Sequence, residues 1–273
     1  MQKTQLAFKK ASGRKSPAGG RNLNLLLLST GFEGYADKVS ALYGASPEHP
    51  KTILYVAYAL KDEADAAARW AERLMPIGIK IIPAHSVKDP IAALDKVDGV
   101  FISGGNTFRL IDRLQKTGLG KAIAKKVKKG MPYMGSSAGT NVACPTMMTT
   151  NDMPIVAPKS FDAMGLVPFQ INAHYFEGDF YYDDSDGKRV PYAGETRTDR
   201  IIEYHEENAT PVVGLREGSA LLIRGKKVEL LGGKPAKVFR RGKAPVDIAT
   251  GKGLESLMKP SPAKRVARTK SAK

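Results

Sequence analysis

The chain has 273 residues, 42% of them hydrophobic, which is enough apolar material for one sizeable core at the upper size limit of a single domain. Cys144 is the only cysteine, so an intramolecular disulfide is excluded, and no apolar run approaches the roughly 18 residues that a membrane-spanning helix needs. The formal net charge of +16 would suit a nucleic-acid-binding protein, but the charge is unevenly distributed.

Both ends of the chain are basic. Residues 1–22 carry six Lys/Arg and no acid, and residues 233–273 carry twelve Lys/Arg against two acids, whereas residues 23–232 are neutral. Segments rich in Lys, Arg, Pro, Ser and Gly bury too little apolar surface to offset the entropy of ordering. We therefore expect a domain at 23–242 between basic flexible tails at 1–22 and 243–273. The tails either aid solubility or make weak, salt-sensitive contacts to a polyanion.

The N-terminal segment has no continuous apolar stretch followed by a small-residue cleavage site, as a secretory signal would. With a single cysteine and no membrane segment, this predicts a cytoplasmic protein without membrane contacts.

Between the tails, short apolar runs alternate with helix-like segments. Helix start and stop signals are clearest in "DEADAAARWAERLMPIG", which has acids at its start and Pro76 and Gly78 at its end. Strands are predicted at 22–29, 51–59, 79–84, 97–105, 131–136 and 167–175, and helices at 62–78, 91–94, 107–119, 121–130 and 200–208. This alternation predicts an α/β fold, a mainly parallel sheet with helices on both faces, in which ligands bind beyond the C-terminal ends of the strands.

A candidate nucleophile lies where the strand at 131–136 ends. "GSSAG", residues 135–139, fits G-x-S-x-G between a strand and a helix-like segment, which is the context of a nucleophile elbow. Ser137 is the central residue of the pattern. An ordinary glycine-rich turn is the alternative interpretation.

A serine nucleophile needs a base, and the chain has four histidines. His49 lies in a "SPEHP" turn and His205 in a charged helix, so both are expected on the surface. His85 follows a strand and is a reserve candidate. His174 ends a strand-like run, and we therefore select it as the base.

Backbone amides near the nucleophile are candidates for an oxyanion hole. One belongs to Ala138. A second is expected from "SGGNT", where Gly104 and Gly105 end a strand and Asn106 opens a helix; Gly105 is the predicted donor. The chain has neither G-x-x-x-x-G-K-[ST] nor G-x-G-x-x-G at this point, which argues against a nucleotide site.

Three motifs taken together resemble the S51 serine peptidase family. They are "GGNTFRL", "GSSAGTNVACPTMMTTNDMPI" and "GLVPFQINAHY", and the resemblance runs from about Leu25 to about Phe239. It implies a class I glutamine amidotransferase-like fold with a serine at the elbow. It also implies release of N-terminal aspartate from Asp-X dipeptides, a small acidic substrate, with no metal or cofactor.

The resemblance implies Ser137 as nucleophile and His174 as general base. Asp152 in "TTNDMPI" matches the acid of the dipeptidases, and Glu217 in "GLREGSAL" matches that of relatives such as cyanophycinase. Either carboxylate could orient the imidazole. We prefer Glu217 as the orienting acid, with Asp152 in the substrate pocket or as an alternative relay.

Substrate binding is assigned to the polar side chains of Asn106, Thr150 and Asn151 and to Arg197, whose guanidinium suits a carboxylate. A hydrogen-bonded turn and a solvated helix end are the alternatives.

Two features depart from the family pattern. Ala173 stands where proline often precedes the histidine, and residues 176–194 form an insert that is either a mobile lid or a surface loop.

Other functions remain open on the sequence alone. The same machinery could cleave a β-aspartyl-arginine linkage or another acidic dipeptide. The order Ser137, Asp152, His174 also fits an α/β-hydrolase esterase. A non-enzymatic scaffold with polyanion-binding tails is the third alternative. The chain could also form a homodimer.

Overall fold

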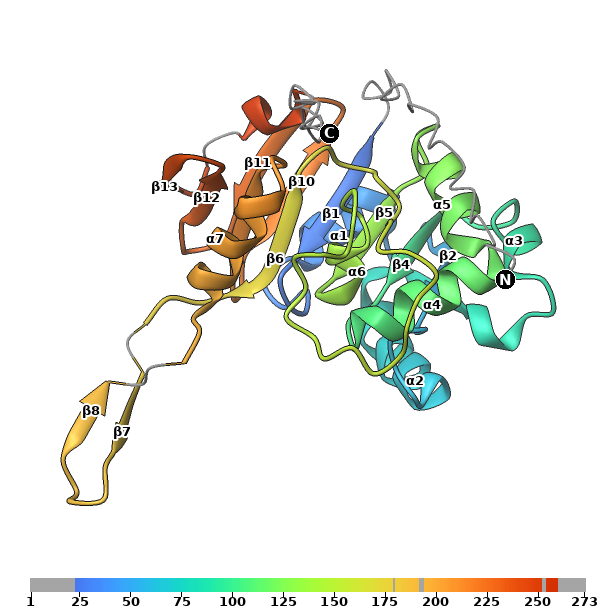
Figure 1. The fold of residues 1–273 in the computed structure, drawn as a ribbon. Coiled ribbons are helices and arrows are strands. Elements are labelled where there is room, and N and C mark those ends of the chain that lie inside the picture. The colour runs from blue at the N-terminus through green and yellow to red at the C-terminus, as the bar shows by residue number, and fades with distance from the viewer. Residues whose placement is uncertain (1–22, 179, 192–193, 252–253, 260–273) are drawn as a thin grey trace, which may run out of the picture.

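The computed structural model describes residues 23–178, 180–191, 194–251 and 254–259. Its centre is a seven-stranded sheet built from β1 (Asn24–Leu28), β2 (Lys51–Val56), β3 (Ile79–Pro83), β4 (Gly99–Ile102), β5 (Tyr133–Ser136), β10 (Ala220–Arg224) and β11 (Lys227–Leu231). The strand order is β11-β10-β1-β5-β4-β2-β3 (Figure 1). The strands from β1 to β3 in this order are parallel, whereas β10 and β11 extend the sheet in antiparallel fashion. The predicted mainly parallel sheet is confirmed.

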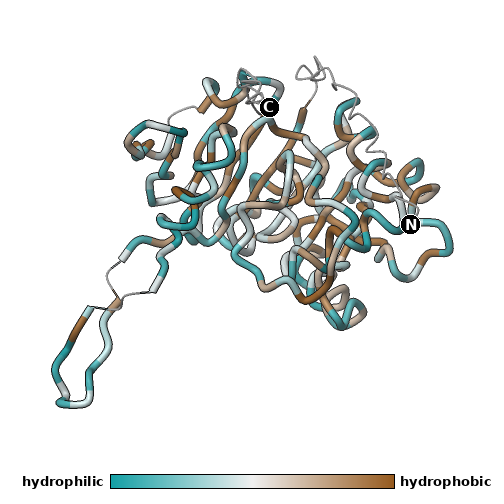
Figure 2. The backbone as a smooth tube through the Cα atoms, viewed as in Figure 1, coloured by the Kyte–Doolittle hydropathy of each residue, from teal (hydrophilic) through white to brown (hydrophobic). Residues whose placement is uncertain are grey.

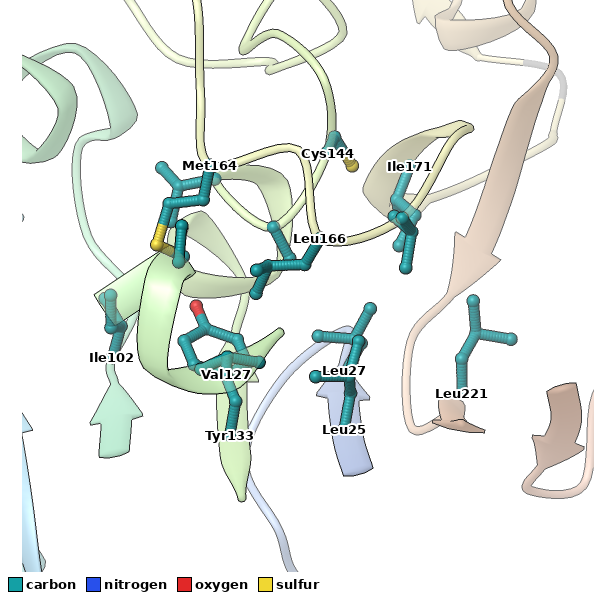
Figure 3. Packing of buried hydrophobic residues seen from close by; sticks show 14 of the residues in the cluster. Leu25, Leu27, Ile102, Val127, Tyr133, Cys144, Met164, Leu166, Ile171 and Leu221 are labelled. Atoms are coloured by element: carbon teal, nitrogen blue, oxygen red, sulfur yellow. The ribbon is translucent and has the colours of Figure 1, made fainter. Parts of the chain in front are cut away.

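The leucine run of β1 explains why this strand is central. Leu25, Leu26, Leu27 and Leu28 are all fully buried, as expected for a strand covered on both faces. Because side chains alternate along a strand, Leu25 and Leu27 join one hydrophobic cluster and Leu26 and Leu28 the other. Figure 3 shows Leu25 and Leu27 beside Tyr133 and Leu166 in the first cluster.

Helices cover both faces, as predicted. α1 (Ala36–Tyr43) and α2 (Glu63–Leu74) contribute to one cluster, and α4 (Thr107–Thr117), α5 (Leu119–Val127) and α6 (Ala138–Asn141) contribute to the other, with the short α3 (Pro90–Ala93) at its edge. There are also three short 3-10 helices, η1 (Met75–Ile77), η2 (Ala84–Ser86) and η3 (Glu255–Met258). Figure 2 shows hydrophobic residues concentrated along the central strands and hydrophilic ones over much of the outer loops.

Local signals fix the ends of the longer helices. Asp62 caps α2 by accepting a hydrogen bond from the Asp65 amide at 2.9 Å, and η1 and a left-handed Gly78 follow its last turn. Asn106 caps α4 in the same way through the Arg109 amide at 3.1 Å. The chain therefore enters α4 directly after the glycine pair, Gly104 and Gly105, that follows β4.

A second, four-stranded sheet was not predicted. It contains β6 (Gln170–Tyr175), β9 (Val212–Arg216), β12 (Ala236–Arg240) and β13 (Lys243–Ile248), in the order β13-β12-β9-β6. α7 (Arg197–Glu207) packs on this sheet through a small cluster of Tyr175, Ile201, Val212 and Phe239. Because the tight turn after β9 leads directly into β10, this turn joins the two sheets.

The insert at 176–194 contains an antiparallel hairpin of β7 (Tyr181–Asp183) and β8 (Arg189–Pro191). The hairpin projects away from the body of the molecule (Figure 1). Tyr181 and Tyr182 are about half exposed, at 49% and 54%. This arrangement agrees with the surface-loop interpretation rather than with a lid held over the sheet.

Two expectations need correction, and one helix was not predicted. The predicted start of a flexible tail at residue 243 is wrong, because β13 pairs with β12 and Leu254 and Leu257 are buried in the main cluster. Residues 1–22 and 260–273 lie outside the described residues. His205 is 8% exposed rather than on the surface, although it lies in a helix rich in charged residues. Helix α1 was not predicted, although its Val39 and Leu42 are buried.

No helix within the described ranges combines the length and apolar character needed to cross a membrane.

Candidate active site

Ser137 lies at a sharp turn between β5 and α6. Its backbone angles are φ 52° and ψ −109°, a conformation that L-residues avoid. A side chain at Gly135 would come within 2.6 Å of the Gly139 carbonyl oxygen, and one at Gly139 would collide with the Ile102 carbonyl oxygen. Both flanking positions therefore require glycine for close packing, which is the physical basis of the elbow.

Neighbouring hydroxyls hold this turn in place. The Thr140 hydroxyl contacts the carbonyl oxygens of Leu28 and Gly135 at 2.7 and 2.9 Å, and the Ser137 amide donates to Leu28 at 3.0 Å. Ser136 donates its hydroxyl to the Thr30 carbonyl oxygen at 2.7 Å. Ser136 is thus occupied structurally, which leaves Ser137 as the serine that faces a base.

His174 is the residue that faces Ser137. Its Nε2 lies 2.8 Å from Ser137 Oγ, and its Nδ1 lies 2.6 Å from Oε2 of Glu217. His174 has φ 56°, at a register shift between Ala173 and Tyr175 in the pairing of β6 with β9. In the described part of the chain, Ser137 and His174 are the two non-glycine residues with positive φ. Backbone strain of this kind is concentrated at functional sites.

Glu217 comes from the turn that joins the two sheets. Gly218 follows with φ 74°, and the Tyr35 hydroxyl donates to the Gly218 carbonyl oxygen at 2.7 Å. The Ser219 amide closes the turn by donating to the Arg216 carbonyl oxygen at 3.0 Å. The Glu217 side chain is 56% exposed, so its bond to His174 is partly open to water.

Asp152 occupies a different position. Its Oδ2 accepts from the Thr107 amide at 2.7 Å, at the start of α4, and contacts the Thr150 hydroxyl at 3.0 Å. Within the described residues it makes no hydrogen bond to His174, whereas Glu217 does. Of the two acids considered from the sequence, Glu217 is therefore the one bonded to the imidazole.

The glycine pair after β4 adjoins the elbow. A side chain at Gly104 would lie 3.0 Å from Ser137 Cβ and 3.5 Å from its Oγ. Gly105 has φ 130° and faces Ala59 and Leu60. No hydrogen bond to another described residue engages the amides of Gly104, Gly105 or Ala138. Gly105 and Ala138 remain predicted oxyanion-hole donors. Gly104 is a third candidate donor, because it is the glycine in direct contact with the elbow.

Arg197 opens α7 on the same side as the histidine. Thr196 and Asp199, on either side of it in the chain, form a capping box, and its Nη1 donates to the Ala173 carbonyl oxygen at 3.3 Å. Burial lowers the pKa of Arg197, while the carboxylates of Glu217 and Asp152 act in the opposite direction. The guanidinium thus lies within electrostatic range of both acids.

The other predicted substrate-binding side chains bond to the protein itself. Asn106 donates Nδ2 to the Met153 carbonyl oxygen at 2.9 Å, and the Thr150 hydroxyl contacts Thr107 Oγ1 at 3.0 Å. Asn151 donates Nδ2 to the Ala173 carbonyl oxygen at 3.0 Å. These bonds agree with the hydrogen-bonded-turn alternative, and a role in substrate binding stays a prediction.

The remaining histidines do not reach the elbow. His49 is exposed, as predicted. Nδ1 of His85 lies 3.7 Å from Glu63, and Nδ1 of His205 lies 3.1 Å from the Asn208 carbonyl oxygen. No group of three or more His, Cys, Asp and Glu within the described ranges could hold a metal ion.

Sequence reasoning missed Tyr35, Gly104 as a contact of Ser137, and Asn172. Asn172 precedes His174 by two positions in β6, and this spacing is the one signal that could have drawn attention to it. Tyr35 is 182 residues away from Glu217 in the chain, and nothing in the sequence links the two.

A hydroxyl, an imidazole and a carboxylate in hydrogen-bonded series are the components of nucleophilic acyl transfer. Free amides beside the hydroxyl could stabilise a developing oxyanion.

Comparison with known proteins finds similar sequences over most of the chain. A sequence profile of peptidase family S51 matches residues 25–231. The chain is 45% identical to Peptidase E of Streptomyces coelicolor over 240 residues, covering 86% of this chain and 95% of the relative. It is 40% identical over 230 residues to a probable alpha-aspartyl dipeptidase of Drosophila melanogaster, covering 82% and 91% respectively.

Solved structures with similar folds have lower sequence identity. A putative Peptidase E from Listeria monocytogenes gives a TM-score of 0.57 at 22% identity, covering 78% of this chain and 99% of that one. A peptidase from an acI-B1 actinobacterium gives a TM-score of 0.61 at 16% identity, covering 86% and 98%. At these identities the likeness concerns the fold alone.

Proposed function

The chain belongs to peptidase family S51, and we therefore propose that it is a serine-type dipeptidase that releases N-terminal aspartate from Asp-X dipeptides. The observation that carries the mechanism is the 2.8 Å contact between Ser137 Oγ and His174 Nε2, with Glu217 bonded to the other ring nitrogen.

In the proposed mechanism, Ser137 Oγ attacks the peptide carbonyl carbon while His174 Nε2 takes its proton. The tetrahedral intermediate collapses when His174 returns this proton to the leaving amine, and the aspartyl group remains as an ester on Ser137. Water activated by His174 then hydrolyses the ester. Glu217 accepts the Nδ1 hydrogen throughout, which fixes the tautomer and stabilises the imidazolium.

We assign the oxyanion to the amides of Ala138 and of the glycine pair, with Gly105 as the sequence-predicted donor and Gly104 as the residue in contact with Ser137. Amides without a protein partner are available to a substrate oxygen. Loss of one such donor typically costs about 100- to 1000-fold in kcat.

Substrate selection is proposed to depend on opposite charges beside the triad. Arg197 would bind the side-chain carboxylate of the substrate aspartate, because its planar guanidinium can bind a carboxylate through two hydrogen bonds. Asp152 would accept hydrogen bonds from the substrate ammonium group. The bonds of Asn106 to Met153 and of Thr150 to Thr107 hold the Asp152 segment against the start of α4.

The test compares wild type with Ser137→Ala on Asp-Leu, β-aspartyl-arginine and a p-nitrophenyl ester. We expect turnover of Asp-Leu and a loss of roughly three or more orders of magnitude in the variant. Turnover of β-aspartyl-arginine instead would favour the cyanophycinase-like alternative. Ester turnover alone would favour an esterase, and full activity in Ser137→Ala would refute the mechanism.

We also propose a cytoplasmic location, which the single, fully buried Cys144 supports because it needs no oxidising compartment. Polyanion contact through the basic ends of the chain, predicted as 1–22 and 243–273, and formation of a homodimer stay predictions.

A further inference from the structure

His174 has a backbone conformation that is unfavourable for an L-residue. Its φ of 56° lies in the left-handed region, and the strand pairing is interrupted there. An L-residue keeps such a conformation only when its surroundings impose it. Since the imidazole must reach both Ser137 and Glu217, the groups that hold this backbone also set the geometry of the triad.

Two side chains hold the carbonyl group directly before His174. The carbonyl oxygen of Ala173 accepts from Asn151 Nδ2 at 3.0 Å and from Arg197 Nη1 at 3.3 Å. A carbonyl fixed from two sides fixes the peptide plane that leads into His174. The orientation of the His174 backbone therefore depends on where Asn151 lies as well as on Arg197, and Asn151 makes the shorter of the two bonds.

Asn172 sets the position of Asn151. Its Nδ2 donates to Asn151 Oδ1 at 2.9 Å and to the Thr149 carbonyl oxygen at 2.9 Å. Asn172 is only 3% exposed, so water cannot readily replace these two bonds. Both hydrogens of its amide group are used, one to hold Asn151 and the other to hold the segment that carries it.

We propose that Asn172 and Asn151 form a relay that positions His174 for catalysis by holding the Ala173 carbonyl group. Neither side chain contacts the reacting atoms, so both are positioning residues. The relay gives Asn151 a role different from the substrate binding expected from the sequence. The inference rests on the proposed function, because it assumes that His174 is the general base.

The test uses Asn172→Leu, which keeps the approximate volume and removes both donors, and Asn151→Ser, which changes a half-buried side chain and spares the fold. The matched control is Asn24→Leu. Asn24 lies on β1, and its Nδ2 also donates to a backbone carbonyl oxygen, that of Leu42, at 3.0 Å. We expect kcat for Asp-Leu to fall about 10- to 100-fold in the two relay variants, with KM within about threefold of wild type. The control should keep its kcat.

A second readout does not depend on the substrate. The proton of His174 Nδ1, bonded to Glu217, should give a downfield NMR resonance that shifts or broadens in the relay variants and is unchanged in Asn24→Leu. A crystal structure of Asn151→Ser should show a changed φ at residue 174.

The two proposals fail separately. If wild type does not cleave Asp-Leu, the proposed function fails, and the resonance and the variant structure still test the relay. The relay is overturned if Asn151→Ser has a kcat within about twofold of wild type, an unchanged His174 Nδ1 proton resonance and an unchanged φ at residue 174. If Asn172→Leu does not fold, Asn151→Ser alone decides.

Discussion

Nδ1 of His174 lies 2.6 Å from Oε2 of Glu217, although β6 and the turn after β9 are separated by 43 residues in sequence. The bond joins the second sheet to the turn that leads back into the first. Because Asp152 is bonded at the start of α4 instead, the two carboxylates have different environments. Different environments predict different kinetic effects when each charge is removed.

Glu217→Gln should lower kcat for Asp-Leu by at least about 100-fold, because an amide can stabilise the wrong imidazole tautomer and carries no charge. The effect should be smaller than for a fully buried acid, since Glu217 is 56% exposed. Asp152→Asn should mainly raise KM, with kcat within about tenfold of wild type. A larger loss of kcat in Asp152→Asn than in Glu217→Gln would contradict this assignment.

Arg197→Lys should raise KM for Asp-X dipeptides by about tenfold or more, because an ammonium group cannot replace the two-bond geometry of a guanidinium. Arg200→Lys is the control, since Arg200 lies on the same helix and is half exposed beside Glu195. Steady-state kinetics on Asp-Leu would check both. Equal KM values in the two variants would remove Arg197 from the substrate site.

Gly104→Ala should impair catalysis more than stability. The added methyl would lie 3.0 Å from Ser137 Cβ, closer than the ~3.5 Å of an ordinary carbon contact. We expect kcat/KM to fall about tenfold or more, since displacement of the nucleophile is costly. Gly233→Ala is the control, because nothing lies within 4 Å of a side chain there. Unchanged kcat/KM in Gly104→Ala would show that the elbow tolerates the methyl group.

Replacing residues 181–191 by a short Gly-Ser linker should leave kcat/KM for Asp-Leu within about twofold, because the hairpin projects away from the body (Figure 1). The replacement spares Glu177, which pairs with Lys237 at 2.6 Å and with Arg216, the residue before Glu217. A loss of more than about tenfold, with the unfolding temperature unchanged, would restore the lid interpretation.

Alkaline pH should destabilise the fold. Burial raises the pKa of Cys144 to about 12 and that of Tyr55 to about 12. Unfolding restores their ordinary pKa values of 9.0 and 10.0, so the unfolded state loses protons first as the pH rises. The stability is complete below about pH 9 and falls toward pH 12.

Urea unfolding midpoints at about pH 8 and about pH 10.5 would check this, and the second should be lower. Cys144 should react with a thiol reagent only after unfolding, because it is fully buried. An equal midpoint at both pH values, or rapid labelling of the native protein, would contradict the prediction.

The sequence by itself determined the features that depend on neighbouring residues. Apolar runs such as Leu25 to Leu28 predict buried strands, and the cap at Asp62 and the breakers at Pro76 and Gly78 bound α2. The elbow was also accessible, because a strand, a small-residue turn and a helix are contiguous around Ser137. Patterns of this kind involve only a few consecutive residues, and the structure contains the strand, the helix and the turn that they predict.

Tertiary structure alone decided which distant groups meet. The sequence allowed either Asp152 or Glu217 beside His174, because no local pattern reports a distance between a strand of one sheet and a turn between two. It also failed to predict β13, whose Lys243, Pro245 and Asp247 resemble a solvated tail until β12 pairs with them. Hydrogen bonds between strands and burial in the interior depend on the whole chain. The same holds for the contacts among Ser137, His174 and Glu217 and for the burial of His205.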